Sequence, residues 1–386
     1  MWLDESHVDG FRWDTPGTML YDGNTYISDA ATLITNITTM VHGNYPGRIN
    51  IAEDVLGMGF DSTWDTTYPY VLTPILANTV DANRDMNLLA NALTTNQRFG
   101  SAAGFNRVVF LESHDVVGDL NNGVRLPAAI DGAAPNSYRA RKLSTLGATL
   151  TFTAPGVPMI FEGQEMLENQ QFSDSRTVDW TKTNTYSAIV TFYHDLIHLR
   201  RNLAGDVPGL KGSQISLLQV DNVNKLVAYY RRAAGTSGQD VVVVANFANA
   251  VRTNYSLPFP ATGNWRVHFN SDSTNYSADY GNVGSTLVTA SGANPAGNIT
   301  IGPYSALILS QMPFPPPLSI TQSNNTVIIS WPNSLTNWVL DVSDTLAGNP
   351  PPWSQVPAAQ YQTNNASIFI GLTPPTGNSF YRLRQL

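Results

Sequence analysis

The stretch Val8-Asp9-Gly10-Phe11-Arg12-Trp13-Asp14 sets the pattern from which the fold of the first half of the chain can be derived. It is a short apolar run that ends in charged side chains, which predicts a strand over Val8–Trp13. Since side chains alternate along a strand, Arg12 and Asp14 share one face and the two aromatic residues share the other. The Arg12 guanidinium would then favour the ionised form of the Asp14 carboxylate. An ordinary structural ion pair is the competing interpretation.

Three later apolar runs have the same design, because each ends in polar or ionisable residues. They predict strands over Ile49–Ala52, Val108–Leu111 and Val157–Phe161. Apolar residues at helical spacing lie between or after them, in Ala30–Val41, Tyr138–Leu150 and Ser187–Leu203. Alternating strands and helices predict a parallel α/β architecture, in which chemistry collects at the carboxyl ends of the strands.

The pattern changes after about residue 205, where short β-rich runs alternate with clusters of Gly, Asn and Asp. This predicts an antiparallel β-sandwich. Its expected strands are Leu217–Val220, Leu226–Arg231, Val241–Phe247, Trp265–Phe269, Thr286–Val288 and Ile299–Ile308. The run Met312-Pro313-Phe314-Pro315-Pro316-Pro317 predicts a stiff spacer before a second small β module. We therefore expect domains at 1–205, 206–311 and 319–386, with a linker at 312–318.

Composition excludes several functional classes. Of the 386 residues, 42% are apolar and 13% charged, which argues against disorder. A net charge of −8 makes a nucleic-acid partner unexpected. No apolar run approaches the roughly 18 residues of a membrane span, so no membrane partner is expected either. The start of the chain lacks the pattern of a signal peptide, and the sequence is compatible with both a cytoplasmic and a secreted location. It carries no indication of oligomeric state.

Two further strand ends carry ionisable residues. Glu53 and Asp54 follow a buried strand, and a carboxylate there is either a helix cap or a site group; one of the two should face solvent. His114 and Asp115 follow the third strand, and a lone His-Asp pair is more often structural than catalytic. There is no Gly-x-Ser-x-Gly elbow nearby, no His-Glu-x-x-His and no cysteine. We therefore expect no hydrolase triad, metal site or cofactor.

The order of these groups along the chain is more informative than any one of them. Carboxylates on successive parallel strands converge on one edge, and two carboxylates flanking one point are what glycosidic cleavage requires. One attacks or stabilises the oxocarbenium-like centre, and the other protonates the departing oxygen. Retaining chemistry needs them about 5–5.5 Å apart, which neighbouring strands can provide.

These blocks resemble the α-amylase superfamily, glycoside hydrolase family 13, and within it the 1,4-α-glucan branching enzymes. Asp9–Asp14 is similar to that family's fourth-strand motif, Ala52-Glu53-Asp54-Val55 to the fifth and Glu112-Ser113-His114-Asp115 to the seventh. Gly156–Glu165 resembles the eighth strand. Three features favour the branching-enzyme subgroup: Met19-Leu20-Tyr21, Gly59-Phe60-Asp61 followed by Trp64, and Ser113 in the seventh-strand motif.

The resemblance implies a role for each residue that matches a motif. Asp14 would be the nucleophile, Glu53 the acid/base, and Asp115 the carboxylate that grips the ring hydroxyls of the sugar being cleaved. Arg12 would hold Asp14 ionised, His114 would donate a hydrogen bond to the same sugar, and Trp64 would stack on a sugar ring. The α/β part would be strands four to eight of a (β/α)8 barrel, so we expect a chain that lacks the first three strands.

Three functions remain open at this point. The first is a branching glucanotransferase acting on α-1,4-glucans, and the second is an α-amylase-like hydrolase. The third is an inactive glucan-binding fragment whose terminal module stacks sugars on tryptophans. Those tryptophans are Trp331, Trp338 and Trp353, although three tryptophans in a small β domain more often form its core.

Overall fold

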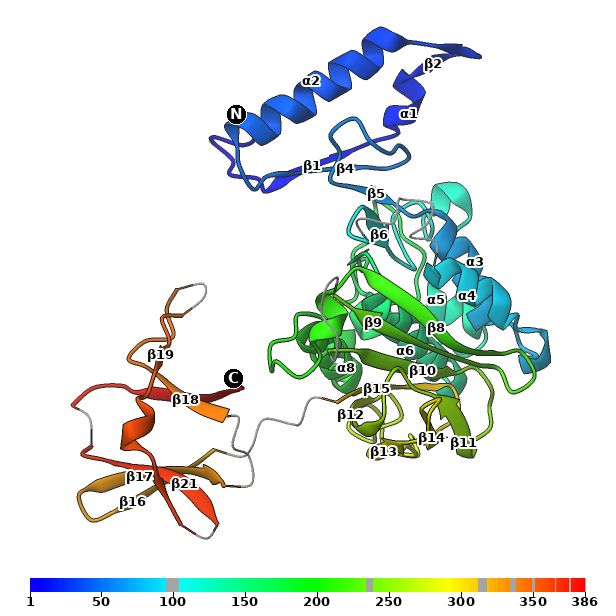
Figure 1. Cartoon of the computed structure of the whole chain (residues 1–386). Helices are drawn as coiled ribbons and strands as arrows, with labels where there is room; N and C mark the ends of the chain where they lie inside the picture. Colours follow the sequence, from blue (N-terminus) through cyan, green and yellow to red (C-terminus); the bar gives the residue numbers. More distant parts are fainter. Residues whose placement is uncertain are drawn as a thin grey trace. The chain divides into compact units, whose positions relative to one another are not determined.

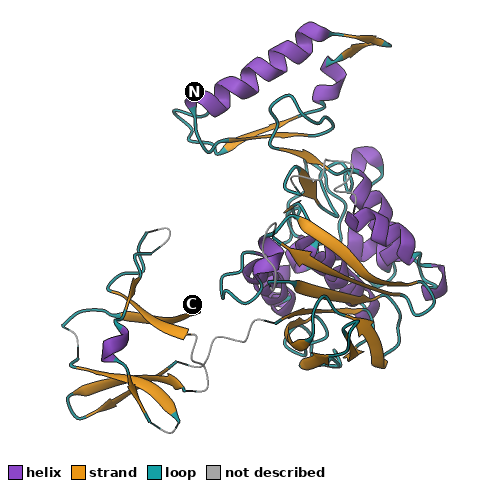
Figure 2. Cartoon of the chain, viewed as in Figure 1, coloured by secondary structure: helices purple, strands orange, loops and turns teal. Residues whose placement is uncertain are grey.

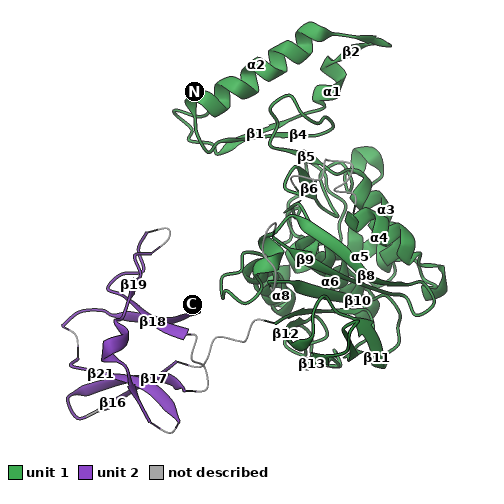
Figure 3. Cartoon of the chain, viewed as in Figure 1, with its two compact units in different colours: residues 1–312 green, residues 313–386 purple. Residues whose placement is uncertain are grey.

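The structure is a computed structural model that describes residues 1–94, 104–233, 239–311, 318–333, 338–348, 351–364, 366–374 and 376–385. The chain divides into two compact units, Met1–Met312 and Pro313–Leu386 (Figure 3). Most helices belong to the first unit, as Figure 2 shows. Among the described residues, no helix is both long and apolar enough to cross a membrane.

A five-stranded parallel sheet forms the first part of unit 1. Its strands are β1 (Gly10–Trp13), β4 (Ile49–Ala52), β5 (Ser62–Trp64), β6 (Arg107–Val109) and β7 (Val157–Pro158). They are hydrogen-bonded in the order β1-β4-β5-β6-β7, so each strand of the sheet lies beside the next one along the chain. Figure 1 labels the first four of them. The predicted parallel sheet is therefore confirmed. The sequence did not indicate β5, because Ser-Thr-Trp is too short and too polar to form an apolar run.

Helices connect and follow these strands. The longer ones are α2 (Ser28–Asn44), α3 (Thr67–Ala77), α4 (Met86–Thr94), α6 (Tyr138–Thr153) and α8 (Ser187–Arg200). Shorter elements are α1 (Pro16–Met19), α5 (Leu126–Ile130), α7 (Lys182–Thr185) and a hairpin of β2 (Tyr21–Asp22) and β3 (Thr25–Tyr26). The Ser137 hydroxyl caps α6 by accepting the Ala140 N–H at 3.2 Å. The three helices expected from apolar spacing are all present, as α2, α6 and α8.

A six-stranded antiparallel sheet makes up most of the second half of unit 1, in the order β13-β12-β15-β10-β9-β8. The strands are β8 (Gln214–Asp221), β9 (Leu226–Arg232), β10 (Val241–Asn246), β12 (Gly263–Asn270), β13 (Leu287–Ala290) and β15 (Ser305–Ser310). A two-stranded sheet of β11 (Arg252–Pro258) and β14 (Ala296–Ile301) accompanies it. The expected single run Ile299–Ile308 was wrong: Gly302-Pro303-Tyr304 interrupts it, with Tyr304 at φ 45°, and two strands result.

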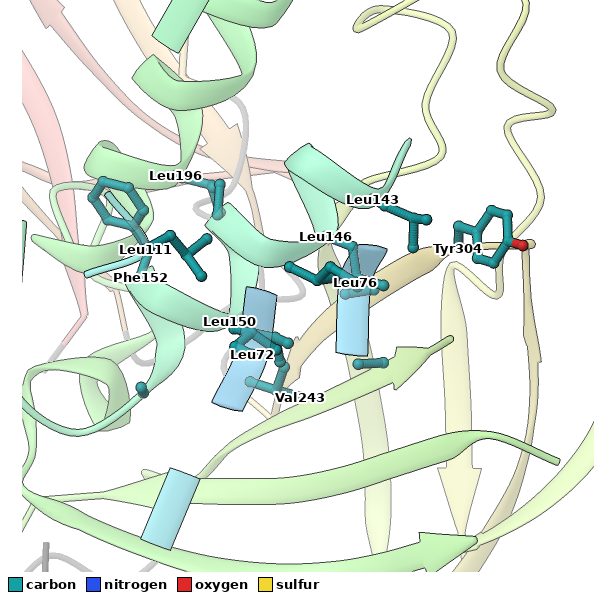
Figure 4. Packing of buried hydrophobic residues seen from close by; sticks show 14 of the residues in the cluster. Leu72, Leu76, Leu111, Leu143, Leu146, Leu150, Phe152, Leu196, Val243 and Tyr304 are labelled. Carbon is teal, nitrogen blue, oxygen red and sulfur yellow. The ribbon is translucent and has the colours of Figure 1, made fainter. Parts of the chain in front are cut away.

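The two central strands of the six-stranded sheet, β10 and β15, are buried on both faces, which explains the unbroken apolar run of β10. One face packs on the helices, with Val241 and Val243 in the same core as Leu72 of α3 and Leu150 of α6 (Figure 4). The other face packs on β11 and β14 through Val242 and its neighbours. A strand covered on both sides has no need of polar alternation.

Buried cationic side chains form ion pairs and hydrogen bonds between the helical layer and the antiparallel sheet. Lys142 of α6 and Asp272 after β12 are both fully buried, and their Nζ and Oδ1 atoms lie 2.6 Å apart. Arg200 and Arg231 donate to backbone carbonyls near the end of α6, where a helix concentrates partial negative charge. The two layers therefore share polar ties as well as an apolar core.

Unit 2 consists of two antiparallel sheets. One has the order β16-β17-β21-β20 and the other β19-β18-β22. Their strands are β16 (Ser319–Ser323), β17 (Thr326–Pro332), β18 (Trp338–Ser343), β19 (Ser354–Gln355), β20 (Gln362–Thr363), β21 (Ser367–Leu372) and β22 (Phe380–Gln385). Trp331 and Trp338 are buried in this module, and the Arg382 guanidinium lies 4.4 Å from the centre of the Trp353 ring. Trp331 and Trp338 therefore belong to the core of the module, whereas Trp353 is half-buried beside Arg382.

Candidate functional site

The carboxyl ends of the parallel strands lie together at one edge of the sheet. Trp13 of β1 pairs with Ala52 of β4, and Ala52 pairs in turn with Thr63 of β5. Trp64 then pairs with Val108 of β6. The predicted site residues sit at or just beyond these positions, so the strand register brings them to one edge, as expected for parallel α/β folds.

Arg12 connects the first two predicted carboxylates. One guanidinium nitrogen makes an ion pair with Asp14, and the other lies 3.1 Å from Glu53 Oε2. Because both nitrogens belong to one planar group, the carboxylates of Asp14 and Glu53 flank the same small region. Asp14 is 76% exposed and Glu53 17% exposed, so one carboxylate is open to solvent and the other is mostly covered.

Trp64 connects Arg12 to the third predicted motif. The guanidinium carbon of Arg12 lies 4.4 Å from the centre of the Trp64 ring, a cation–π contact. The His114 ring approaches the Trp64 ring edge-on at 6.1 Å, and Phe110 packs on the same ring at 5.1 Å. Arg12 therefore covers part of the aromatic surface that a sugar would need.

His114 and Asp115 occupy a turn that follows β6. Their side chains are 46% and 44% exposed, and His114 Nε2 lies 3.4 Å from Asp115 Oδ2. Val117 N–H donates to the Ser113 carbonyl at 3.0 Å and closes the turn. All six predicted site residues are thus connected by contacts. Arg12 contacts Asp14, Glu53 and Trp64. Trp64 in turn contacts His114, which pairs with Asp115.

The loop after β1 is tied to the end of β4 by both adjacent carboxylates. Glu53 Oε2 accepts the Thr15 N–H at 2.7 Å, and Asp54 Oδ1 accepts the Gly17 N–H at 2.9 Å. Asp54 is the exposed member of the pair. Thr15 has φ 32° and ψ 53°, a left-handed conformation that a β-branched residue rarely adopts. Strain of this kind concentrates at functional sites, because surrounding contacts must hold it.

A buried ion pair between Glu112 and Arg125 precedes the His114–Asp115 turn in the chain, and the sequence indicated no role for it. Glu112 and Arg125 are each about 2% exposed, and Arg125 Nη1 lies 2.9 Å from Glu112 Oε2. Burial raises the pKa of Glu112, although Arg125 and the Leu126 N–H oppose that shift. The sequence did contain a signal for this pair, because Glu112 follows an apolar run directly. A carboxylate buried at such a position requires a charged partner.

The described residues hold no group of three or more His, Cys, Asp or Glu side chains close enough to bind a metal ion. His194 and His198 lie one turn apart on α8 with ring centres 4.0 Å apart, and the His194 side chain is 61% exposed. They belong to the helix surface.

Sequence comparison relates the chain to carbohydrate-active proteins. Residues 218–311 match the family described as alpha amylase, C-terminal all-beta domain. The 1,4-alpha-glucan branching enzyme GlgB of Nitrosococcus oceani is 27% identical over 363 residues, covering 82% of this chain and 46% of the relative. GlgB of Mesorhizobium japonicum is 25% identical over 346 residues, covering 80% and 44%. The chain spans about half the length of the curated relatives it matches.

Solved structures show a similar fold. An α-amylase from Geobacillus thermoleovorans complexed with acarbose gives a TM-score of 0.57 at 17% identity, covering 80% of this chain and 61% of that one. An Anoxybacillus α-amylase gives 0.58 at 18% identity, covering 80% and 60%. Together, the matched β domain, the sequence relatives and the fold confirm that the chain resembles the α-amylase superfamily, glycoside hydrolase family 13, and within it the 1,4-α-glucan branching enzymes.

Proposed function

We propose that this chain carries the catalytic edge of an α-1,4-glucan-active enzyme that works by retaining double displacement. The observation that carries the proposal is the guanidinium of Arg12, which contacts Asp14 and Glu53 together at the carboxyl edge of the parallel sheet. Two carboxylates placed around one point, one open to solvent and one largely covered, suit a nucleophile and a proton donor.

The fold assignment is part of the proposal. The sequential order β1-β4-β5-β6-β7 supports reading these strands as strands four to eight of a (β/α)8 barrel within residues 1–205. Residues 206–311 are then the β domain that follows such barrels, and residues 319–386 a separate small β-sandwich after the linker at 312–318.

In the proposed mechanism, Asp14 attacks the anomeric carbon while Glu53 protonates the leaving glycosidic oxygen. A covalent glycosyl-enzyme forms, and Glu53 then removes a proton from the acceptor as that acceptor attacks. Asp115 and His114 bind hydroxyls of the same sugar, and Arg12 orients Asp14 through their ion pair. Trp64 supports the guanidinium of Arg12 and stacks on a sugar ring with the part of its face that Arg12 leaves uncovered.

The acceptor determines the reaction class. We propose the 6-hydroxyl of another glucan chain, which makes the enzyme a branching glucanotransferase. Similarity to branching enzymes over four-fifths of the chain favours this choice. If water is the acceptor, the enzyme is an α-amylase-like hydrolase, and the α-amylase-like fold is compatible with that outcome.

The first test is binding. Titration calorimetry of the chain with acarbose, the ligand of a structurally similar α-amylase, should give saturable heat, because the site requires no turnover to bind. Asp115→Asn should weaken that binding about tenfold, since it removes the charge facing the sugar hydroxyls. The control is Asp9→Asn, because Asp9 is 92% exposed and pairs with Arg48.

The second test is turnover on amylose. Branching lowers iodine colour with almost no new reducing ends, whereas hydrolysis lowers the colour and raises reducing ends together. Asp14→Asn and Glu53→Gln should each remove nearly all turnover, while Asp9→Asn keeps it. More than a few per cent of residual activity in either site variant would contradict the assigned roles. Acarbose binding without any turnover would identify a glucan-binding protein.

A further inference from the structure

The turn that bears His114 and Asp115 has few side-chain supports of its own. Both side chains are about half exposed; they contact each other, and the His114 ring also contacts the Trp64 ring. The Asn121 side chain donates to the Asp115 carbonyl at 3.1 Å, which holds backbone and not the carboxylate. The direction of these two side chains therefore follows from the backbone of the turn, which begins at Ser113 and is held at its far end by hydrogen bonds to Phe172.

Glu112 precedes that turn and fixes its starting point. It is 1% exposed, and its Oε1 accepts the Leu126 N–H at 2.6 Å while its Oε2 accepts from Arg125 at 2.9 Å. Residue 112 is thus bound to residues 125 and 126 on the far side of the loop. The two ends of the loop cannot move apart without breaking both hydrogen bonds.

Arg125 extends this anchor to the segment that follows β7. Its Nη1 also donates to the Glu162 carbonyl at 2.9 Å, and its Nε donates to the Gln170 carbonyl at 3.2 Å. Its guanidinium carbon lies 4.7 Å from the centre of the Phe161 ring. One planar cation therefore holds a carboxylate and two carbonyls in fixed directions, which a lysine cannot do.

A buried ion pair stabilises a fold inefficiently, because both charges lose their hydration. Burial raises the pKa of Glu112 although Arg125 opposes the shift, so desolvation disfavours the charged carboxylate at this position. Well-packed apolar residues commonly serve a buried position at least as well. What the ion pair supplies and an apolar pair cannot is direction: two hydrogen bonds join the ends of the 112–126 loop, and two more join Arg125 to the segment after β7.

We propose that Glu112 and Arg125 are positioning residues that fix the His114–Asp115 turn relative to Trp64 and the other carboxylates. Neither residue touches substrate; they act through the backbone of the turn. The consequence for glucan binding rests on the proposed function, whereas the positioning itself does not.

The experiment compares Glu112→Gln and Arg125→Lys with a matched control, Asp272→Asn. The first substitution leaves one acceptor oxygen for two donors, the Arg125 guanidinium and the Leu126 N–H, and the second removes the forked geometry of the cation. Asp272 belongs to another fully buried carboxylate–cation pair, with Lys142, which joins α6 to the segment after β12 and not to the His114 loop. Glu112→Gln and Asp272→Asn each remove the carboxylate of a buried ion pair, so general destabilisation affects these two alike, whereas Arg125→Lys keeps the charge and changes only its geometry.

The direct readout is the ring signal of His114 in protein with 13C-labelled histidine, at one pH, assigned by its disappearance in His114→Asn. We expect this signal to shift or broaden in Glu112→Gln and Arg125→Lys and to stay in place in Asp272→Asn. The functional readout is acarbose affinity by calorimetry, which should fall about tenfold or more in the first two variants only, since small displacements of site groups carry large penalties.

Two results would overturn the proposal: a His114 signal that coincides with wild type in both variants, or an equal displacement in Asp272→Asn. If wild type does not bind acarbose at all, the proposed function fails, and the ring signal still decides the positioning role. Should Glu112→Gln not fold, Glu112→Leu/Arg125→Met replaces it, because removing both charges restores packing without restoring the hydrogen bonds.

Discussion

The substitution Asp272→Asn tests how strongly the helical layer of unit 1 is fastened to the antiparallel sheet. Asp272 Oδ1 accepts from Lys142 Nζ at 2.6 Å, and Oδ2 accepts the Val283 N–H at 2.9 Å. Asparagine keeps the shape but has a single acceptor oxygen, so one of these two donors loses its partner. The charge on Lys142 then remains buried without a counter-ion.

The expected magnitude follows from the burial of both partners. Removing one member of a fully buried ion pair costs about 3–5 kcal/mol, because an uncompensated charge remains. For a unit of this size each kcal/mol lowers the melting temperature by about 2 °C, so the loss should be about 6–10 °C. Burial lowers the pKa of Lys142, and Asp272 opposes this shift in the native protein. The substitution therefore removes the group that stabilises the charge on the lysine.

Thermal unfolding followed by circular dichroism gives the measurement, and the chain offers a control on the same loop. Asp279 is 48% exposed and pairs with Arg141, which makes Asp279→Asn a loss of about 0–1 kcal/mol. The double variant Lys142→Met/Asp272→Asn should recover most of the stability, since neither member of the buried ion pair keeps its charge. An Asp272→Asn melting temperature within about 1 °C of Asp279→Asn would refute the reasoning, because the two losses should differ by several degrees.

Three further predictions concern the candidate site. Gly118→Ala places a methyl group 2.3 Å from the His114 carbonyl oxygen, and the turn should move because a backbone atom cannot shift easily. Acarbose affinity measured by calorimetry should then fall about tenfold, and unchanged affinity would contradict this prediction. Trp64→Ala removes the ring beneath Arg12 and should weaken acarbose about tenfold by the same assay, or about 1.4 kcal/mol, and a loss below twofold would exclude a binding role. Burial raises the pKa of Glu112, so its contribution to stability is present below pH 4.5 and is lost as the pH rises through the folded-state pKa. The melting temperature of wild type relative to Glu112→Gln should therefore decline as the pH rises above about 4.5, and an increasing difference would contradict the shift.

Sequence reasoning identified what depends on local pattern. Apolar runs that end in charged residues located four of the five parallel strands, and helical spacing located α2, α6 and α8. The same local pattern singled out Asp14, Glu53 and Asp115 as ends of successive strands. It missed β5 and β11, because a strand with little apolar character is defined by its neighbours and not by its own composition.

The contacts within the candidate site could not be derived in this way. That Arg12 would lie over Trp64 while contacting Glu53, and that Glu112 would pair with Arg125, depend on the register between strands and on loops that meet in space. Local periodicity determines which side chains leave a strand together, since it follows from backbone geometry alone. Which partners those side chains meet is decided only when distant segments pack. The physical reason is that an unpaired charge becomes strongly unfavourable only once it is buried, and burial does not depend on sequence spacing.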